Sequence, residues 1–122
     1  SRRQRQMCIR DRIVAFGNML DNALEACEGV PGAQIRLQAY LAKGYLVIHE
    51  RNPVRAEPAA AKPRRILELE RGVGFRVLSG LAQKYDGSFQ HELEPGGDYA
   101  VTLMLKAAPD PVVNPEKIAE RS

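Results

Sequence analysis

The apolar residues of this chain switch between two repeats, and that switch restricts the folds it can form. Between residues 13 and 28, apolar side chains recur every three or four positions, which is the repeat of one face of an α-helix. From Ala33 to Leu41 they alternate with polar residues, as in a half-buried strand. Such elements must bury their apolar faces against each other, so the pattern predicts layers of helix and sheet. The apolar stripe predicted for the first helix consists of Ile13, Phe16, Leu20, Leu24 and Cys27.

The same order of elements repeats in the second half of the chain. A turn at Lys43-Gly44 between two strand-like segments predicts an antiparallel hairpin. The elements expected after the first strand are a strand over 45–51, a long loop or lid over 52–69, a helix over 75–85, and strands over 88–93 and 99–106. This order predicts an α+β fold, a two-layer α/β sandwich with its helices on one face of a mostly antiparallel sheet.

The formal charge of +3 on the 122 residues is concentrated at the N-terminal end. Residues 1–12 contribute +4 and leave the remainder with a net charge of −1. Within them, the peptide MCIRD is similar to a translated adapter of sequencing libraries, so we interpret residues 1–12 as a non-native leader. A genuine basic arm is the alternative. Since the remainder is not basic, we expect no nucleic-acid partner.

Residues 13–106 are then expected to form a single domain, followed over 107–122 by a loosely ordered tail with three prolines. No apolar run in the sequence has the length of a membrane span, and no signal-peptide pattern is present. Cys27 is the one cysteine outside the leader, which is typical of a reducing compartment. We therefore expect a cytoplasmic location without direct membrane contact by this part of the chain.

Two asparagines and a glutamate share one face of the first predicted helix. Asn18, Asn22 and Glu25 lie within about 60° of one another on a helical projection, opposite the apolar stripe. Asparagine is a poor helix former, so two of them in mid-helix suggest a role beyond solubility. Amide oxygens suit Mg²⁺, which takes its remaining ligands from water and phosphates. The pattern predicts a metal and phosphate site, with a solvated polar face as the alternative.

These residues carry a family resemblance. The segment GNMLDNALEAC, residues 17–27, resembles the asparagine box of the GHKL superfamily of gyrase-type ATPases, chaperones, histidine kinases and mismatch-repair ATPases. It is most similar to peptide-receptor kinases of the quorum-sensing class. The resemblance implies a Bergerat-type ATP-binding fold that lacks its first strand and helix here, which should leave apolar surface exposed. It also implies ATP and Mg²⁺ as cofactors, with Asn22 as a metal ligand.

Two further segments match the family less closely. Gly72-Val73-Gly74-Phe75 resembles the later glycine box, where glycines let the backbone approach a polyphosphate at the start of a helix. His49 to Pro53 stands in place of the first glycine box but lacks its glycines. In the quorum-sensing class an asparagine commonly occupies this place, so Asn52 is the candidate contact to adenine. A strand-ending asparagine before proline is the alternative. The nucleotide-binding residues implied are Asn18, Asn22, Glu25, Asn52, Gly72, Gly74 and Phe75.

The resemblance implies the catalytic domain of a two-component sensor histidine kinase. It would transfer the γ-phosphoryl group of ATP to a histidine on an upstream dimerisation domain, and alone it would be inactive. Asn18 stands where the hydrolytic branches carry a glutamate general base, and an amide cannot accept that proton. The implied partners are a response regulator and a second copy of a membrane-anchored parent. The alternatives are a degenerate GHKL module that acts through protein contacts and, less favoured, a hydrolytic ATPase.

Overall fold

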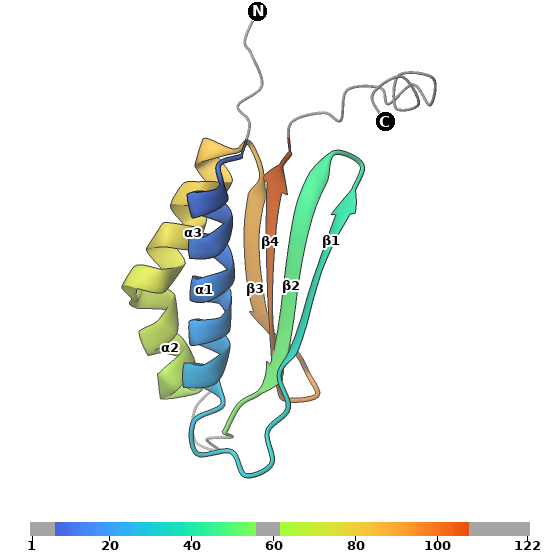
Figure 1. Ribbon diagram of the computed structural model, residues 1–122. Helices are drawn as coiled ribbons and strands as arrows, with labels where there is room; N and C mark the ends of the chain where they lie inside the picture. The colour runs from blue at the N-terminus through green and yellow to red at the C-terminus, as the bar shows by residue number, and fades with distance from the viewer. Residues whose placement is uncertain (1–6, 56–61, 108–122) are drawn as a thin grey trace, which may run out of the picture.

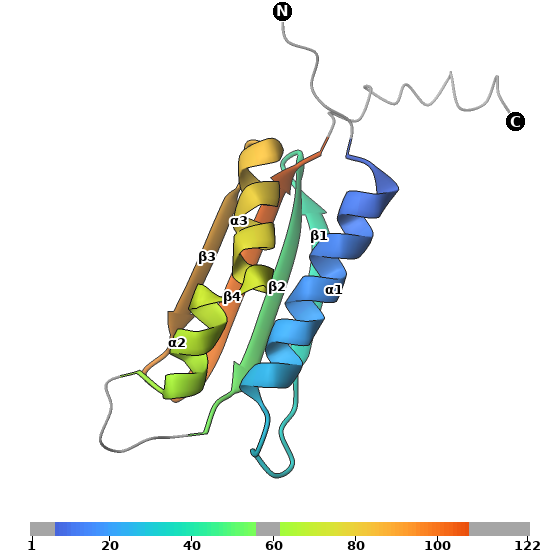
Figure 2. The same cartoon turned by 90° about the vertical axis from the view of Figure 1, so that its left-hand side faces the viewer.

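The computed structural model describes residues 7–55 and 62–107, and it has two layers (Figure 1). The elements are α1 (Ile9–Ala26), β1 (Arg36–Ala42), β2 (Tyr45–Pro53), α2 (Arg64–Arg71), α3 (Val73–Lys84), β3 (Ser88–Leu93) and β4 (Asp98–Lys106). The helices lie together on one face of the sheet, and the turned view places α1 over β1 and β2 (Figure 2). The predicted α+β two-layer sandwich is confirmed.

The sheet has the strand order β1-β2-β4-β3, and every pair is antiparallel. The β1–β2 hairpin turns at Lys43 and Gly44, whose φ angles of 52° and 83° are those of a tight two-residue turn. In the central pair, Ile48 lies opposite Leu103 and Asn52 opposite Tyr99. Because these residues share the face that the helices cover, the end of β2 carries polar side chains into the interior.

The buried face of α1 is not the predicted apolar stripe. Ile13, Leu20 and Leu24 are 66%, 43% and 55% exposed. The side chains that α1 buries are Ala15, Met19, Asn22, Ala23 and Ala26. Of the other two stripe residues, Cys27 is buried and Phe16 packs partly buried against the core, so the stripe prediction is wrong in part, and the buried face is rotated by about 100° around the helix axis. Apart from Met19, the buried hydrophobic residues of α1 are alanines, which let the helix lie close to α3 and the sheet, while Ile13, Leu20 and Leu24 remain on the outside.

The predicted loop over residues 52–69 is shorter than expected. The strand β2 continues to Pro53, and α2 begins at Arg64, directly after Pro63. Ile66 and Leu69 of α2 are buried in the core, because residues three apart lie on one side of a helix. The prolines that precede α2 favoured the interpretation of the whole segment as a loop, so the spacing of Ile66 and Leu69 was not recognised as helical. The centre of the predicted lid, residues 56–61, lies outside the described residues.

The first helix begins at Ile9, four residues earlier than expected. Met7 is buried in the core, and Asp11 accepts hydrogen bonds from Lys84 Nζ, at 2.8 Å, and from the Tyr85 hydroxyl. The non-native origin of residues 1–12 stays a prediction.

Residues 108–122 of the predicted tail lie outside the described part of the chain. Within residues 7–55 and 62–107, none of the helices has the length and apolarity needed to cross a bilayer.

Candidate functional site

The asparagine pair of α1 faces the start of α3. A Cβ atom added to Gly74 would lie 2.8 Å from Asn22 Oδ1 and 3.3 Å from Asn18 Oδ1. Real Cβ atoms are not found within 3.0 Å of another group, so only glycine lets α3 approach these amide oxygens so closely. The structure thus brings Asn18, Asn22 and Gly74 together from two predicted motifs.

The nitrogen atoms of the two side-chain amides point away from Gly74, whereas both amide oxygens face it. Asn18 Nδ2 donates to the Val14 carbonyl oxygen at 2.8 Å, which orients the side chain along the helix. Asn22 is 8% exposed, and its Nδ2 atom has no hydrogen-bond partner within the described part of the chain. Two neutral, hard oxygens at one point form a donor set that suits Mg²⁺. Asn22, with Asn18 beside it, therefore fits the predicted metal site.

Glu25 and Phe75 do not join this cluster with their side chains. Glu25 is exposed, although sequence spacing placed it on the same face as Asn22. Phe75 is buried and packs edge-to-face on Phe89, with ring centroids 5.0 Å apart. A Cβ on Gly72 would lie 3.3 Å from the Leu69 carbonyl oxygen, so this glycine tightens the junction of α2 and α3. Any phosphate contact of Gly72 or Phe75 would come from the backbone.

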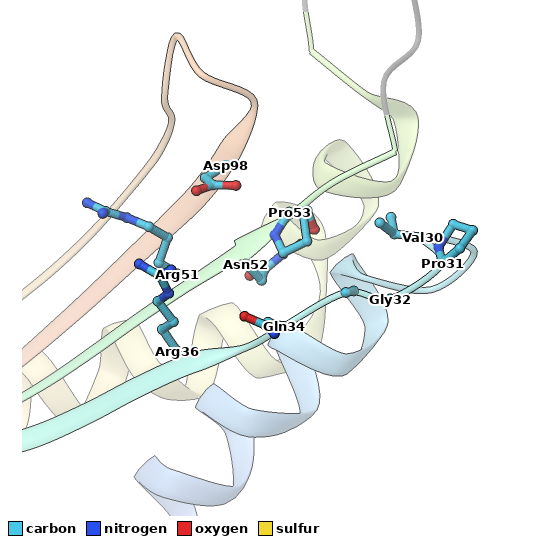
Figure 3. A pocket seen from close by; sticks show the side chains of 10 residues that line it. Val30, Pro31, Gly32, Gln34, Arg36, Arg51, Asn52, Pro53 and Asp98 are labelled. Carbon is cyan, nitrogen blue, oxygen red and sulfur yellow. The ribbon is translucent and has the colours of Figure 1, made fainter.

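Asn52 lies at the end of β2, 1% exposed. Its Nδ2 atom donates to the Pro53 carbonyl oxygen at 2.9 Å, and its Oδ1 atom has no partner among the residues described. A cavity of about 360 Å³ opens beside it (Figure 3). Other residues on its wall include Pro31, Gln34, Arg36, Arg51 and Asp98. Asn52 is the only one of the seven predicted site residues that lines this cavity.

Glu50 is a buried polar residue that the sequence analysis did not identify. It is 1% exposed, on the same face of β2 as Asn52, and its Oε1 atom lacks a hydrogen-bond partner in the described segments. Burial raises the pKa of Glu50 to about 8, so the carboxyl is mostly protonated at neutral pH. The pKa of Cys27 is raised by burial and by the nearby Glu50 carboxylate. An alternation count along β2 would have placed Glu50 inside.

Hydrogen bonds and ion pairs of Glu70 connect α2 to the sheet, close to the turn at Gly72. Glu70 accepts hydrogen bonds from Lys62 Nζ and the Tyr99 hydroxyl, both at 2.8 Å, and lies 3.0 Å from His91 Nδ1. Burial alone would raise the pKa of Glu70, but the bonds from Lys62 and Tyr99 lower it below the ordinary value. These contacts hold the end of α2, and hence the following turn, in a defined position.

A second ion pair joins α2 to the end of α1. Arg65 Nη1 lies 3.0 Å from Glu28 Oε2, and both side chains are largely exposed. An exposed pair of this kind contributes little stability. The buried Ile66 and Leu69 therefore hold α2 in place more than this ion pair does.

Replacing Gly74 with alanine is expected to destabilise the chain by about 1–3 kcal/mol, because the new methyl group overlaps the Asn22 amide. Gly80 provides a matched control in the same helix, since a Cβ there meets nothing within 4 Å. The G80A change should stabilise by about 0.5–1 kcal/mol through helix propensity. Urea unfolding of both variants measures the difference. Stabilisation by both changes would show that the contact between Gly74 and the asparagines does not form in solution.

Comparison with known proteins identifies the family of this chain. A family model described as GHKL domain matches residues 7–105, a range that holds the asparagine pair, the glycine turn and the strands of the sheet except the last residue of β4. No curated protein matches the chain. The match covers most of the 122 residues and starts within the segment interpreted as a leader. On the strength of this match, the chain belongs to the GHKL domain family, whose members are ATP-binding domains.

Proposed function

We propose that this chain is the ATP- and Mg²⁺-binding catalytic domain of a two-component sensor histidine kinase. The observation that carries the proposal is the convergence of Asn18 and Asn22 on Gly74, a contact that only glycine permits. Core packing by itself does not require a pair of amides at this point. Membership of the GHKL family supports ATP as the ligand.

Each site residue has a distinct role in this proposal. Asn22 would hold Mg²⁺ through its amide oxygen, with Asn18 as a second oxygen nearby. The backbone N–H groups at the start of α3, after Gly72, would bind phosphate oxygens, since a helix N-terminus favours anions. Asn52 would accept a hydrogen bond from the exocyclic amine of adenine. Glu25, which is exposed at the end of α1, would act at the rim of the site.

Phosphoryl transfer fits these residues better than hydrolysis. An amide at Asn18 cannot take a proton from an attacking water, so the site lacks the general base of the hydrolytic branches. The residues would act by positioning ATP and by electrostatic stabilisation, and a bound Mg²⁺ would neutralise charge on the phosphates.

The phosphate acceptor is proposed to be a histidine on an upstream dimerisation domain. His49 Nδ1 bonds to Thr102 Oγ1 at 2.7 Å, and His91 bonds to Tyr99 and Glu70. Both histidines lie on strands and form hydrogen bonds within the sheet or to α2, which makes them poor acceptors of a phosphoryl group. The intact protein would then be a membrane-anchored homodimer that signals to a response regulator from its cytoplasmic side.

Titration calorimetry with Mg²⁺-ATP tests the proposal. Replacing Asn22 with alanine should weaken binding by tenfold or more, and chelation of Mg²⁺ should lower the affinity of the unmodified chain by a similar factor. Gln38→Ala is the control, because it removes an exposed amide from β1. Tight binding that the N22A change leaves unaltered would refute the assignment of Asn22.

The alternative function is a degenerate GHKL module that acts through protein contacts without ATP turnover. It is favoured by the absence of glycines after Asn52, in the segment that stands in place of the first glycine box. Thermal melting separates the two functions, since Mg²⁺-ATP at a hundred times its dissociation constant would stabilise by about 2.7 kcal/mol. A folded chain whose melting does not respond to Mg²⁺-ATP would favour the degenerate module.

A further inference from the structure

Three polar atoms without partners lie on α1 and on the strand β2 beneath it. They are Asn22 Nδ2, Glu50 Oε1 and Asn52 Oδ1, and none has a hydrogen-bond partner among residues 7–55 and 62–107. Their side chains are 8%, 1% and 1% exposed. A buried polar group without a partner costs about 1–3 kcal/mol and is uncommon in folded proteins. A ligand that offers both donors and acceptors would supply the missing bonds.

We propose that Glu50 is a second contact to the purine base, beside Asn52. The inference rests on the proposed function, which places the base at Asn52. Side chains two positions apart on a strand lie on the same face, with Cα atoms about 7 Å apart. One planar ring system can therefore reach both groups. Of the two residues only Asn52 lines the cavity, so Glu50, two residues nearer the middle of β2, would be the deeper contact, reached by a base that enters past Asn52.

The surroundings of Glu50 determine which hydrogen bonds it can form. The ionisable groups whose pKa values Glu50 raises are the Cys27 thiol at the end of α1 and the Tyr99 hydroxyl on β4, and Tyr99 in turn bonds to Glu70 of α2. No cation pairs with Glu50 within the described part of the chain, and burial raises the pKa of its carboxyl. Glu50 therefore enters the site as a neutral acid, with an O–H donor and a carbonyl acceptor.

This pair of groups matches adenine better than guanine. Adenine presents an exocyclic amine next to ring nitrogens that accept hydrogen bonds. Asn52 Oδ1 would accept from the amine, and the Glu50 O–H would donate to a neighbouring ring nitrogen. Guanine has an oxygen in place of that amine, which would face the Asn52 oxygen without a hydrogen between them. Glu50 and Asn52 together would thus select an adenine nucleotide.

Nucleotide titrations of the full chain test this inference at about pH 6, below the folded pKa of Glu50. Glu50→Val should lower the affinity for Mg²⁺-ATP tenfold or more and reduce the preference for ATP over GTP. Glu50→Gln, which keeps a donor and an acceptor, should restore most of the lost affinity. Ile48→Val is the matched control, because it loosens the same face of β2 without changing a polar group. Circular dichroism verifies that each variant is folded.

Base analogues distinguish a contact from an indirect effect. The loss caused by E50V should vanish with either 1-deaza-ATP or 7-deaza-ATP, whichever lacks the ring nitrogen that Glu50 binds. If the loss persists with both analogues, or if E50V binds ATP as tightly as the unmodified chain, Glu50 is not a base contact. In that case a loss of binding in N22A would leave the proposed function standing. Failure of the unmodified chain to bind Mg²⁺-ATP would overturn both.

Discussion

Replacing Gly87 with alanine is expected to unfold most of the chain. Gly87 joins α3 to β3, and a Cβ atom there would lie 1.7 Å from the Met104 carbonyl oxygen and 2.6 Å from its carbon. Met104 belongs to β4, an interior strand paired on both sides, so its backbone cannot move away without breaking the sheet. The expected loss is about 4 kcal/mol or more, which is most of the stability of a small domain.

Far-UV circular dichroism and urea unfolding would measure this effect. Gly96→Ala is the control, because Gly96 also lies in a turn of this chain, yet a Cβ there meets nothing within 4 Å. The control should change the free energy of unfolding by no more than about 0.5 kcal/mol. A G87A chain that melts like the control would show that the α3–β3 corner does not lie against β4.

The stability of the chain is expected to fall as the pH rises from about 5 to 8. The pKa of Glu50 is about 8 in the folded chain, against 4.5 for the ordinary group. Between these values the folded state holds a proton that the unfolded state has lost, so each pH unit costs about 1.4 kcal/mol. The whole window corresponds to about 5 kcal/mol, with stability fully present below pH 4.5 and no further loss above pH 8.

Urea unfolding across this pH range, with and without Glu50→Gln, measures the contribution of Glu50. The E50Q variant should show little change between pH 5 and 8 and should be the more stable of the two at pH 8. The pKa of Glu70 is lowered, so its contribution is lost only as the pH falls below its ordinary range. The pKa of Cys27 is raised from its ordinary value of 9.0, so its thiol affects the free energy of unfolding only at a pH above this range. Constant stability of the unmodified chain from pH 5 to 8 would show that Glu50 is not buried as a neutral acid.

Local repeats predicted much of the fold. The alternation over residues 33–41 and 99–106 predicted strands, and the turn residues predicted antiparallel hairpins, because side chains on a strand follow its own period. The short helix α2 was missed, since its two buried residues, Ile66 and Leu69, follow a segment rich in proline. Local periodicity is weak evidence in an element of eight residues.

The buried face of α1 shows a second limit of sequence patterns. Large apolar residues such as Ile13 and Leu24 define the obvious stripe, yet the fully buried residues of α1 are Ala15, Ala23 and Ala26 together with a single large side chain, Met19. Whether a helix packs through large or small side chains depends on how close its neighbours lie. That distance is a property of the assembled layers rather than of the helix.

The amino-acid sequence by itself determined that two amides lie one turn apart on a helix and that a glycine turn precedes another helix, because such spacing is a matter of local backbone geometry. Only the tertiary structure decided that Gly74 meets Asn18 and Asn22, and that Glu50 lies buried without a partner. Those outcomes depend on packing between elements that are distant along the chain. No local repeat predicts these contacts, because their free energy depends on how all the elements of the core pack together.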